Sequence, residues 1–205
     1  WFNPLLNYKF FMVPGILVFL VTMLGAIMCS LNIVREKEIG TIEQINVSPV
    51  KKYHFILGKL IPFWIIGMFI FTVGLTIARF VYGIVPEGSI GVMYGFLSVY
   101  LLAVLGMGLL ISTYSDTQQQ AMSLSFFFIM IFNLLSGLFT PIESMPEWAQ
   151  VITWFNPLSY FIEVMRLVVL KGSGFNEVKS HLLSMLGFAV ILNGWAILNY
   201  RKTSR

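Results

Sequence analysis

Charged side chains are scarce in this sequence. Only 11% of its 205 residues are Asp, Glu, Lys or Arg, whereas 58% are hydrophobic, and the mean hydropathy is +0.84. A water-soluble domain of this length cannot bury that much apolar surface. The composition therefore excludes the soluble protein classes and indicates an integral membrane protein.

Groups that perform covalent or metal chemistry are also scarce. Cys29 is the single cysteine, so no disulfide can form within the chain, and His54 and His181 have no companions at metal-ligand spacing. The serines of the apolar stretches lack a histidine or carboxylate that would activate them. The sequence also lacks Gly-x-x-x-x-Gly-Lys-[Ser/Thr], the loop that cradles nucleotide phosphates. We therefore expect no metal site, no catalytic site and no cofactor bound by this chain, and we assign any use of ATP and Mg²⁺ to a partner protein.

The sequence does contain five apolar stretches of about 20 residues, the length that a helix needs to cross the ~30 Å hydrocarbon core of a bilayer. Because apolar and polar residues do not alternate in them, helices are favoured over an outer-membrane barrel. We predict an all-α integral membrane protein with five transmembrane helices, forming a single domain over residues 1–205. The predicted spans cover, approximately, residues 10–33, 60–80, 90–112, 121–140 and 181–200.

A polar stretch, residues 34–59, separates the first two apolar stretches and must lie outside the bilayer. Within it, Ile39, Ile42 and Ile45 recur every third residue, which predicts a short surface helix with a narrow apolar stripe. Ser48-Pro49 is typical of the N-cap and first turn of a second helix that leads into the next span. Two interpretations stay open: a solvated connection that only orients the protein, or a docking surface for a partner.

Residues 141–179 hold two further hydrophobic segments, each too short to cross a bilayer. The second segment starts at an Asn156-Pro157 cap and ends at Lys171-Gly172, so its helix would rise only about 21 Å. We predict re-entrant or interfacial helices on the outer side of the membrane. The first segment follows Pro146 and places bulky apolar residues at helical spacing (Trp148, Val151, Ile152 and Phe155).

Two small groups of polar residues in these regions are candidate site residues. Glu163 and Arg166 lie three residues apart in the second short segment, and we hypothesise that they pair with each other or across a dimer to close an outer gate. The alternative is that both side chains reach interfacial water. The fourth apolar stretch contains small and polar residues that either line a substrate path or serve helix packing (Ser125, Asn133, Ser136 and Gly137).

The basic residues predict the orientation of the chain, because loops on the cytoplasmic side carry an excess of Lys and Arg. They flank the spans and do not gather on one face, so they favour a topology signal over a nucleic-acid surface. The bias places residues 34–59 and the C-terminus in the cytoplasm and the start of the chain outside. The predicted cytoplasmic side holds Arg35, Lys37, Lys51, Lys52, Lys59, Arg201, Lys202 and Arg205, and the other side holds Lys9, Arg79, Arg166, Lys171 and Lys179.

The polar stretch contains the pattern Glu36-x-Glu38-x-Gly40-Thr41-x-Glu43-Gln44, followed by Ser48-Pro49, directly after the first apolar span. In residue types, spacing and position it resembles the cytoplasmic coupling loop of permease subunits of ATP-binding cassette exporters of type 2, the ABC-2 family. Trp1-Phe2-Asn3-Pro4 and the Asn156-Pro157 segment are similar to further landmarks of these permeases. The resemblance covers nearly the whole chain.

The resemblance implies that the coupling helix docks on a separate ABC ATPase, which hydrolyses ATP with Mg²⁺. It also implies a dimer of two identical or homologous permease copies in the lipid of a bacterial plasma membrane, exporting a hydrophobic or amphipathic substrate. Family members usually have an N-terminal span and an external domain ahead of Trp1, so the chain is expected to be the C-terminal part of a longer subunit. The implied coupling residues are Glu36, Glu38, Ile39, Gly40, Thr41, Ile42, Glu43, Ile45, Ser48 and Pro49.

Two other function classes stay open as alternatives. The first is a non-transporting sensor or assembly subunit whose ATPase powers something other than export. The second is a channel or secondary carrier, which the sequence disfavours because the middles of all five apolar stretches lack Asp, Glu, Lys, Arg and His.

Overall fold

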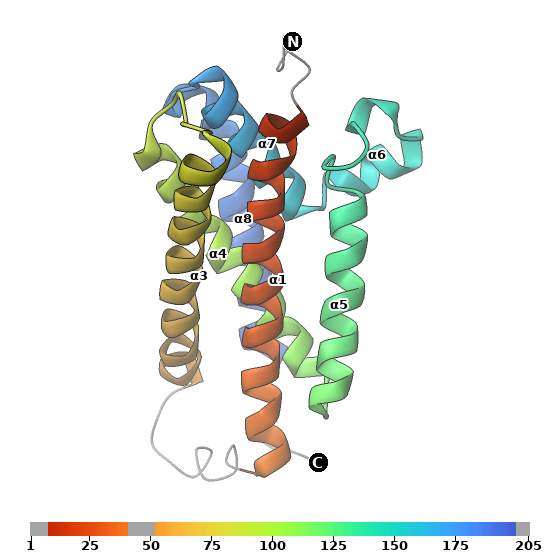
Figure 1. Cartoon of the computed structure of the whole chain (residues 1–205). Coiled ribbons are helices and arrows are strands. Elements are labelled where there is room, and N and C mark those ends of the chain that lie inside the picture. The colour runs from red at the N-terminus through yellow and green to blue at the C-terminus, as the bar shows by residue number, and fades with distance from the viewer. Residues whose placement is uncertain (1–7, 41–51, 200–205) are drawn as a thin grey trace.

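A computed structural model describes residues 8–40 and 52–199, and within these ranges the chain forms helices and no strand. Five long helices run side by side, and three short ones gather at one end of the bundle (Figure 1). The fold class is therefore confirmed as all-α. The helices are α1 (Tyr8–Ile39), α3 (Lys52–Tyr82), α4 (Ile90–Tyr114), α5 (Gln118–Leu134), η1 (Ile142–Ser144), α6 (Glu147–Thr153), α7 (Pro157–Lys171) and α8 (Phe175–Asn199).

Polar contacts at the helix ends fix the directions of the long helices. Glu36 near the end of α1 bonds Lys59 near the start of α3, so these two helices are antiparallel. Asn199 at the end of α8 donates to the hydroxyl of Tyr114 at the end of α4 at 2.7 Å, so α8 runs parallel to α4. The long helices α1, α3, α4, α5 and α8 thus alternate in direction along the bundle, as Figure 1 shows. We call the end where α1 finishes the loop end, and the opposite end the α7 end.

Helix α4 forms the centre of the bundle and contacts α1 at very close range. A Cβ atom on Gly108 of α4 would lie 2.7 Å from the backbone oxygen of Ala26 and 3.0 Å from Cβ of Cys29, both on α1. On the same face of α1, a Cβ atom on Gly25 would lie 3.3 Å from the side chain of Val104. Small residues on both helices therefore let the two backbones approach closely. In a bilayer the hydrophobic effect does not drive helices together, so their association depends on such close packing.

Among the described residues, four helical segments have the length and apolar composition to cross a membrane: residues 9–39, 56–82, 90–114 and 175–199. These agree with four of the five predicted spans. The fifth helix, α5, has 17 residues and rises about 26 Å, slightly less than the hydrocarbon core. That α5 crosses the membrane stays a prediction.

The predicted span over residues 121–140 is wrong at its C-terminal end, because α5 stops at Leu134. The hydroxyl of Ser136 donates to the backbone oxygen of Asn133 at 2.6 Å and accepts from the backbone N–H of Leu138. Gly137 then adopts a φ of 79°, a conformation that favours glycine. A serine side chain that competes for backbone hydrogen bonds, followed by a left-handed glycine, ends the helix within an apolar stretch.

At the loop end, α1 continues through Ile39, beyond the predicted span limit at residue 33. The charged residues that were assigned to a surface loop and helix therefore begin on α1 itself, which is a correction to that prediction. Gly40 ends the helix with a φ of 78°, and no atom lies within 4 Å of where its Cβ would be. Its glycine is thus explained by backbone conformation. The rest of the predicted coupling segment, with Thr41, Ile42, Glu43, Ile45, Ser48 and Pro49, lies outside the described residues.

The two short segments predicted within residues 141–179 do form helices, α6 and α7, whereas their re-entrant or interfacial position on the outer side stays a prediction. The side chain of Asn156 caps α7 by accepting from the N–H of Leu158 at 3.0 Å, and Gly172 ends the helix with a φ of 66°. The ring of Phe161 stacks against Phe96 and lies 4.5 Å from the ring of Tyr100, both on α4. Helix α7 therefore packs into the bundle. The four apolar residues predicted for the first short segment are instead all exposed: Trp148, Val151 and Ile152 on α6, and Phe155 just after it.

The close contact between α1 and α4 predicts opposite effects for two glycine substitutions on one helix. Gly108→Ala should destabilise the protein by about 1 to 3 kcal/mol, because the added methyl group meets backbone. Gly95→Ala is the matched control, since no atom lies within 4 Å of its Cβ position. It should be neutral or stabilising by up to about 1 kcal/mol. Melting temperatures of both variants in detergent test this, and equal stability would contradict the packing described.

The direction of the helices predicts labelling from opposite sides of the membrane. Ser115 is fully buried, so the exposed neighbouring Asp116 at the loop end is the better site for a cysteine. In a Cys29→Ser background, Asp116→Cys should react with a membrane-impermeant maleimide only from the cytoplasmic side. Glu147→Cys, at the exposed start of α6, should react only from outside. Labelling of both from one side would contradict the crossing by α5.

Candidate functional site

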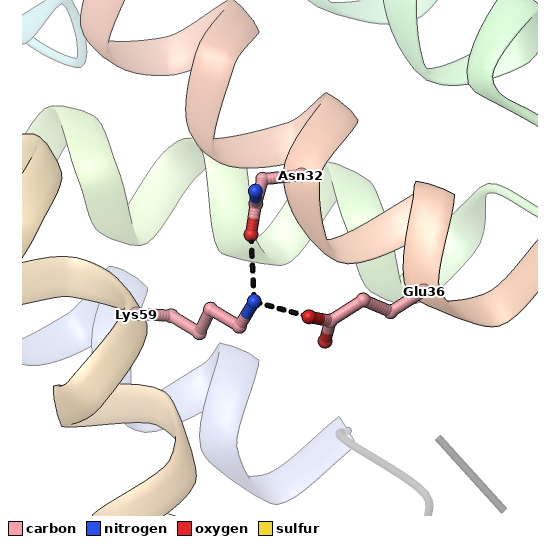
Figure 2. Close-up of polar contacts among 3 residues, drawn as sticks. All are labelled: Asn32, Glu36 and Lys59. Atoms are coloured by element: carbon pink, nitrogen blue, oxygen red, sulfur yellow. Dashed lines mark hydrogen bonds and ion pairs between the residues drawn. The ribbon is translucent and has the colours of Figure 1, made fainter. Parts of the chain in front are cut away.

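The first polar cluster lies at the loop end, where Lys59 of α3 reaches across to α1. Its ammonium group donates to Oε1 of Glu36 and, at 3.0 Å, to Oδ1 of Asn32 (Figure 2). Asn32 and Glu36 are one helical turn apart, so they face the same way on α1. The side chains of Lys59 and Glu36 are only 25% and 23% exposed. Such a half-buried pair depends on both partners more than a surface pair does.

The next residue along α1, Lys37, binds the end of α4. Its ammonium group donates to the backbone oxygens of Ser112 and Ser115, the latter at 3.1 Å. The last carbonyl groups of a helix have no partner within the helix and carry partial negative charge. Lys37 therefore caps the C-terminal end of α4 from the side of α1.

The third consecutive residue, Glu38, binds the start of α5. Its carboxylate accepts from the backbone N–H of Gln118 at 2.7 Å and from the side-chain amide of the same residue. The hydroxyl of Thr117 accepts from the N–H of Gln120 at 3.2 Å and caps the same turn. A carboxylate at a helix N-terminus also interacts favourably with the helix dipole. Glu38 thus ties the end of α1 to α5.

Three consecutive side chains at the end of α1 therefore attach it to three different helices, and residues 41–51 follow directly. Residues 41–51 join α1 to α3, and the contacts of Glu36, Lys37 and Glu38 link the end of α1 to α3, α4 and α5. The sequence analysis identified Glu36 and Glu38 but treated Lys37 and Lys59 only as topology signals. The i, i+4 spacing of Asn32 and Glu36 is the signal that could have indicated a shared partner.

The remaining described coupling residues differ in exposure. Ile39 is 63% exposed, so the first member of the predicted apolar stripe is accessible to a partner. Glu36 and Glu38 instead have partners within the chain, so the structure gives them contacts that the predicted ATPase-facing role did not include. Their part in ATPase coupling stays a prediction.

The second polar cluster surrounds a cavity of about 520 Å³ at the α7 end, lined by α1, the turn after α5, η1, the end of α6 and α7. Arg166 of α7 forms part of its wall. Its guanidinium group donates to the backbone oxygen of Gly137 at 3.0 Å and lies 3.7 Å from the ring centroid of Phe11. Burial lowers the pKa of Arg166 to about 10, while the carboxylates of Glu163 and Glu143 act in the opposite direction. The group is therefore cationic at neutral pH.

The predicted outer-gate pair does not form within the chain. Arg166 bonds Gly137, whereas the carboxylate of Glu163 has its nearest basic partner in Nε2 of His181, at 4.0 Å. The side chain of Glu163 is 56% exposed, which agrees with the alternative that it reaches water. An i, i+3 spacing places two side chains on one face of a helix without requiring that they form a contact. Here the guanidinium of Arg166 donates to the carbonyl of Gly137 instead. Pairing across a dimer stays a prediction.

The four predicted substrate-path residues fall into two groups. Ser125 is buried against α1, where its hydroxyl lies 2.9 Å from that of Ser30. Asn133 is also buried on the face of α5 that meets the bundle. Ser136 and Gly137 line the cavity at the α7 end, next to Arg166. Ser125 therefore lies in the contact between α5 and α1, whereas Ser136 and Gly137 line the cavity, and a substrate path through these residues stays a prediction.

Comparison of the sequence with known proteins identifies its family. The family model described as "ABC-2 family transporter protein" matches residues 1–198. The chain belongs to the ABC-2 family. The resemblance seen in the loop sequence is thus confirmed over nearly the whole chain.

Curated relatives of this ABC-2 protein include permeases of Escherichia coli (strain K12). The chain is 36% identical over 98% of its length to the "Probable multidrug ABC transporter permease YbhR", covering 55% of that protein. It is 32% identical over its full length to the "Probable multidrug ABC transporter permease YbhS", covering 54%. It is 29% identical over 98% of its length to the "Inner membrane transport permease YhhJ", covering 54%. The chain spans about half the length of these relatives.

The ion pair at the loop end predicts coupled effects on the stability of the ABC-2 protein. Glu36→Gln and Lys59→Met should each lower the melting temperature of the full-length permease, because each leaves a half-buried charge without its main partner. The double variant should recover part of the loss, with a coupling energy of about 1 to 3 kcal/mol. Glu177→Gln, at an exposed position on α8, is the control and should have no effect. If the stability changes of the two single variants simply add up in the double variant, the pair does not stabilise the protein.

Proposed function

We propose that this chain is the transmembrane part of a permease subunit that exports a hydrophobic or amphipathic substrate, driven by a separate ABC ATPase. The observation that carries the proposal is the cluster at the loop end. Three consecutive residues of α1 attach to α3, α4 and α5 immediately before residues 41–51. A partner that displaces this segment therefore acts on four helices at once.

Exposed apolar surface supports an ATPase docking site at this end. Ile39 is 63% exposed, and Ile42 and Ile45 continue its sequence pattern outside the described residues. Burial of one such isoleucine side chain contributes roughly 1.5 to 3 kcal/mol, so three of them would supply a large part of the roughly 8 kcal/mol that micromolar docking requires. The positive charge bias of the same end supports a cytoplasmic location, where an ATPase finds its nucleotide.

Helix α5 connects the two polar clusters. This position favours a transport function for the chain over a purely structural one. Its first turn is bound by Glu38 of α1. Near its other end, the backbone oxygen of Phe132 accepts from the side-chain amide of Asn156 at 2.7 Å, and that of Gly137 accepts from Arg166. The helix thus extends from the proposed docking end to the wall of the cavity. We infer that motion at the loop end changes the shape of this cavity on the outer side.

A charge in the apolar stripe should disrupt ATPase docking. Ile42→Asp in the full-length permease should weaken association with the ATPase by at least tenfold, because an apolar side chain is replaced by an ion at the interface. Membrane insertion should be unaffected, since Ile42 lies outside every predicted span. Co-purification and substrate-stimulated ATP hydrolysis in liposomes measure the two effects. Val85→Asp is the control, because Val85 is 58% exposed in the turn at the α7 end.

Two results would separate the proposal from its alternatives. Normal co-purification and transport by Ile42→Asp would show that the loop is only a connection between helices. An intact ATPase complex that hydrolyses ATP but moves no amphipathic substrate would favour a sensor or assembly subunit.

A further inference from the structure

The cavity at the α7 end has the size and walls of a small-molecule site. Its volume of about 520 Å³ falls within the roughly 300 to 1,000 Å³ typical of ligand pockets. Five separate segments of the chain contribute to it. The aromatic side chains of Phe11 and Trp154 supply apolar walls, and Trp154 is 70% exposed.

The neutral hydroxyl groups of the cavity are already engaged with backbone. Ser136 donates to Asn133 at 2.6 Å, Ser159 donates to Asn156 at 2.8 Å, and Tyr160 donates to Trp154 at 3.0 Å. A hydroxyl group that already donates its one hydrogen bond to a carbonyl can only accept a hydrogen bond from a ligand. Recognition in this cavity therefore depends on its charged groups.

Arg166 is a fixed cation with unused hydrogen-bond capacity. One nitrogen, Nη2, donates to Gly137, and the guanidinium plane is held against Phe11. Its Nε is buried and has no hydrogen-bond partner among the described residues. Because a guanidinium has five donors, the hydrogens of Nη1 and the second hydrogen of Nη2 are left for a carboxylate or phosphate. A desolvated cation of this kind favours an anionic ligand group.

Two carboxylates face the same space. Glu143 of η1 and Glu163 of α7 both line the cavity, and both interact electrostatically with Arg166. Neither forms an ion pair with Arg166 within 4 Å among the residues that the structure describes. A purely anionic ligand would therefore be repelled by the carboxylates, and a purely cationic one by the guanidinium.

We propose that this cavity binds the zwitterionic head group of an amphipath, with its phosphate or carboxylate on Arg166 and its ammonium group between Glu143 and Glu163. The exposed ring of Trp154 lies where the ammonium or the first part of an apolar chain can contact it. The inference names a substrate class for the proposed exporter and in that respect rests on the proposed function.

Binding of a fluorescent short-chain phosphatidylethanolamine tests the head-group preference. The label is placed on an acyl chain, and anisotropy is measured with the full-length permease in non-ionic detergent without ATP. Phosphatidylglycerol with the same label lacks the ammonium group, and the labelled diacylglycerol lacks both charges. The zwitterion should bind at least tenfold more tightly than either. Equal binding of the three lipids would overturn the proposal.

Variants assign the charges to their partners. The double change Glu143→Gln and Glu163→Gln should weaken the binding of phosphatidylethanolamine at least tenfold. The affinity for phosphatidylglycerol should stay the same or increase. Arg166→Gln should weaken the binding of both phospholipids. Glu147→Gln, exposed on α6 and outside the cavity, is the control. If Arg166→Gln fails to fold, the carboxylate variants and the comparison of the three lipids still test the proposal. Unchanged phosphatidylethanolamine affinity in the double variant would overturn the proposal.

Competition identifies the source of the head group. Displacement by glycerophosphoethanolamine, which has no acyl chains, would support a soluble zwitterion as ligand. Displacement by chain-bearing phosphatidylethanolamine alone would support a bilayer lipid. Since no ATP is present, the result is independent of export. A retained head-group preference without ATP-driven transport would overturn the proposed function only, and transport without that preference would overturn this inference only.

Discussion

The close approach of α1 and α4 is the contact on which the rest of the structure depends. Gly108 brings the backbone of α4 against Ala26 and Cys29, and a methyl group in that space would force the helices apart. With α4 fixed, α1 also packs on α3, α5 and α7. The same helix lines the cavity with Phe11 at one end and presents Glu36, Lys37 and Glu38 at the other. A steric contact in the middle thus positions polar contacts at both ends.

Helix α5 is held differently from α4. Its buried residues recur every fourth position, so it touches the bundle along one narrow stripe (Ala121, Ser125, Ile129 and Asn133). Polar contacts bind its two ends, to Glu38 at the loop end and to Asn156 near the cavity. A helix with one thin line of contact and two terminal hydrogen-bonded attachments can tilt at lower cost than α4, most of whose residues are buried.

Span positions and caps could be predicted from the sequence because they follow from local rules. Length and hydropathy located four spans, and Asn156, Pro157 and Gly172 marked the ends of α7 correctly. The early end of α5 was missed, because the turn at Ser136 and Gly137 lies inside an apolar run. The partners of Glu36 and Arg166 were missed because they depend on which helices meet. Lys59 is on α3 and Gly137 follows α5, and no periodicity in the sequence contains that information.

The strengths of these contacts determine how a docking partner can act. The half-buried pair of Glu36 and Lys59 is expected to contribute about 1 to 3 kcal/mol. Glu38 is exposed, where water weakens charged contacts further. Burial of the three isoleucines of the predicted stripe would contribute roughly 4 to 9 kcal/mol. Separation of α1 from α4 would instead expose a tightly packed seam along both helices, which costs several kcal/mol more. On the proposed function, a docked ATPase therefore has enough energy to rearrange the polar ties at the loop end while the α1 and α4 core stays intact.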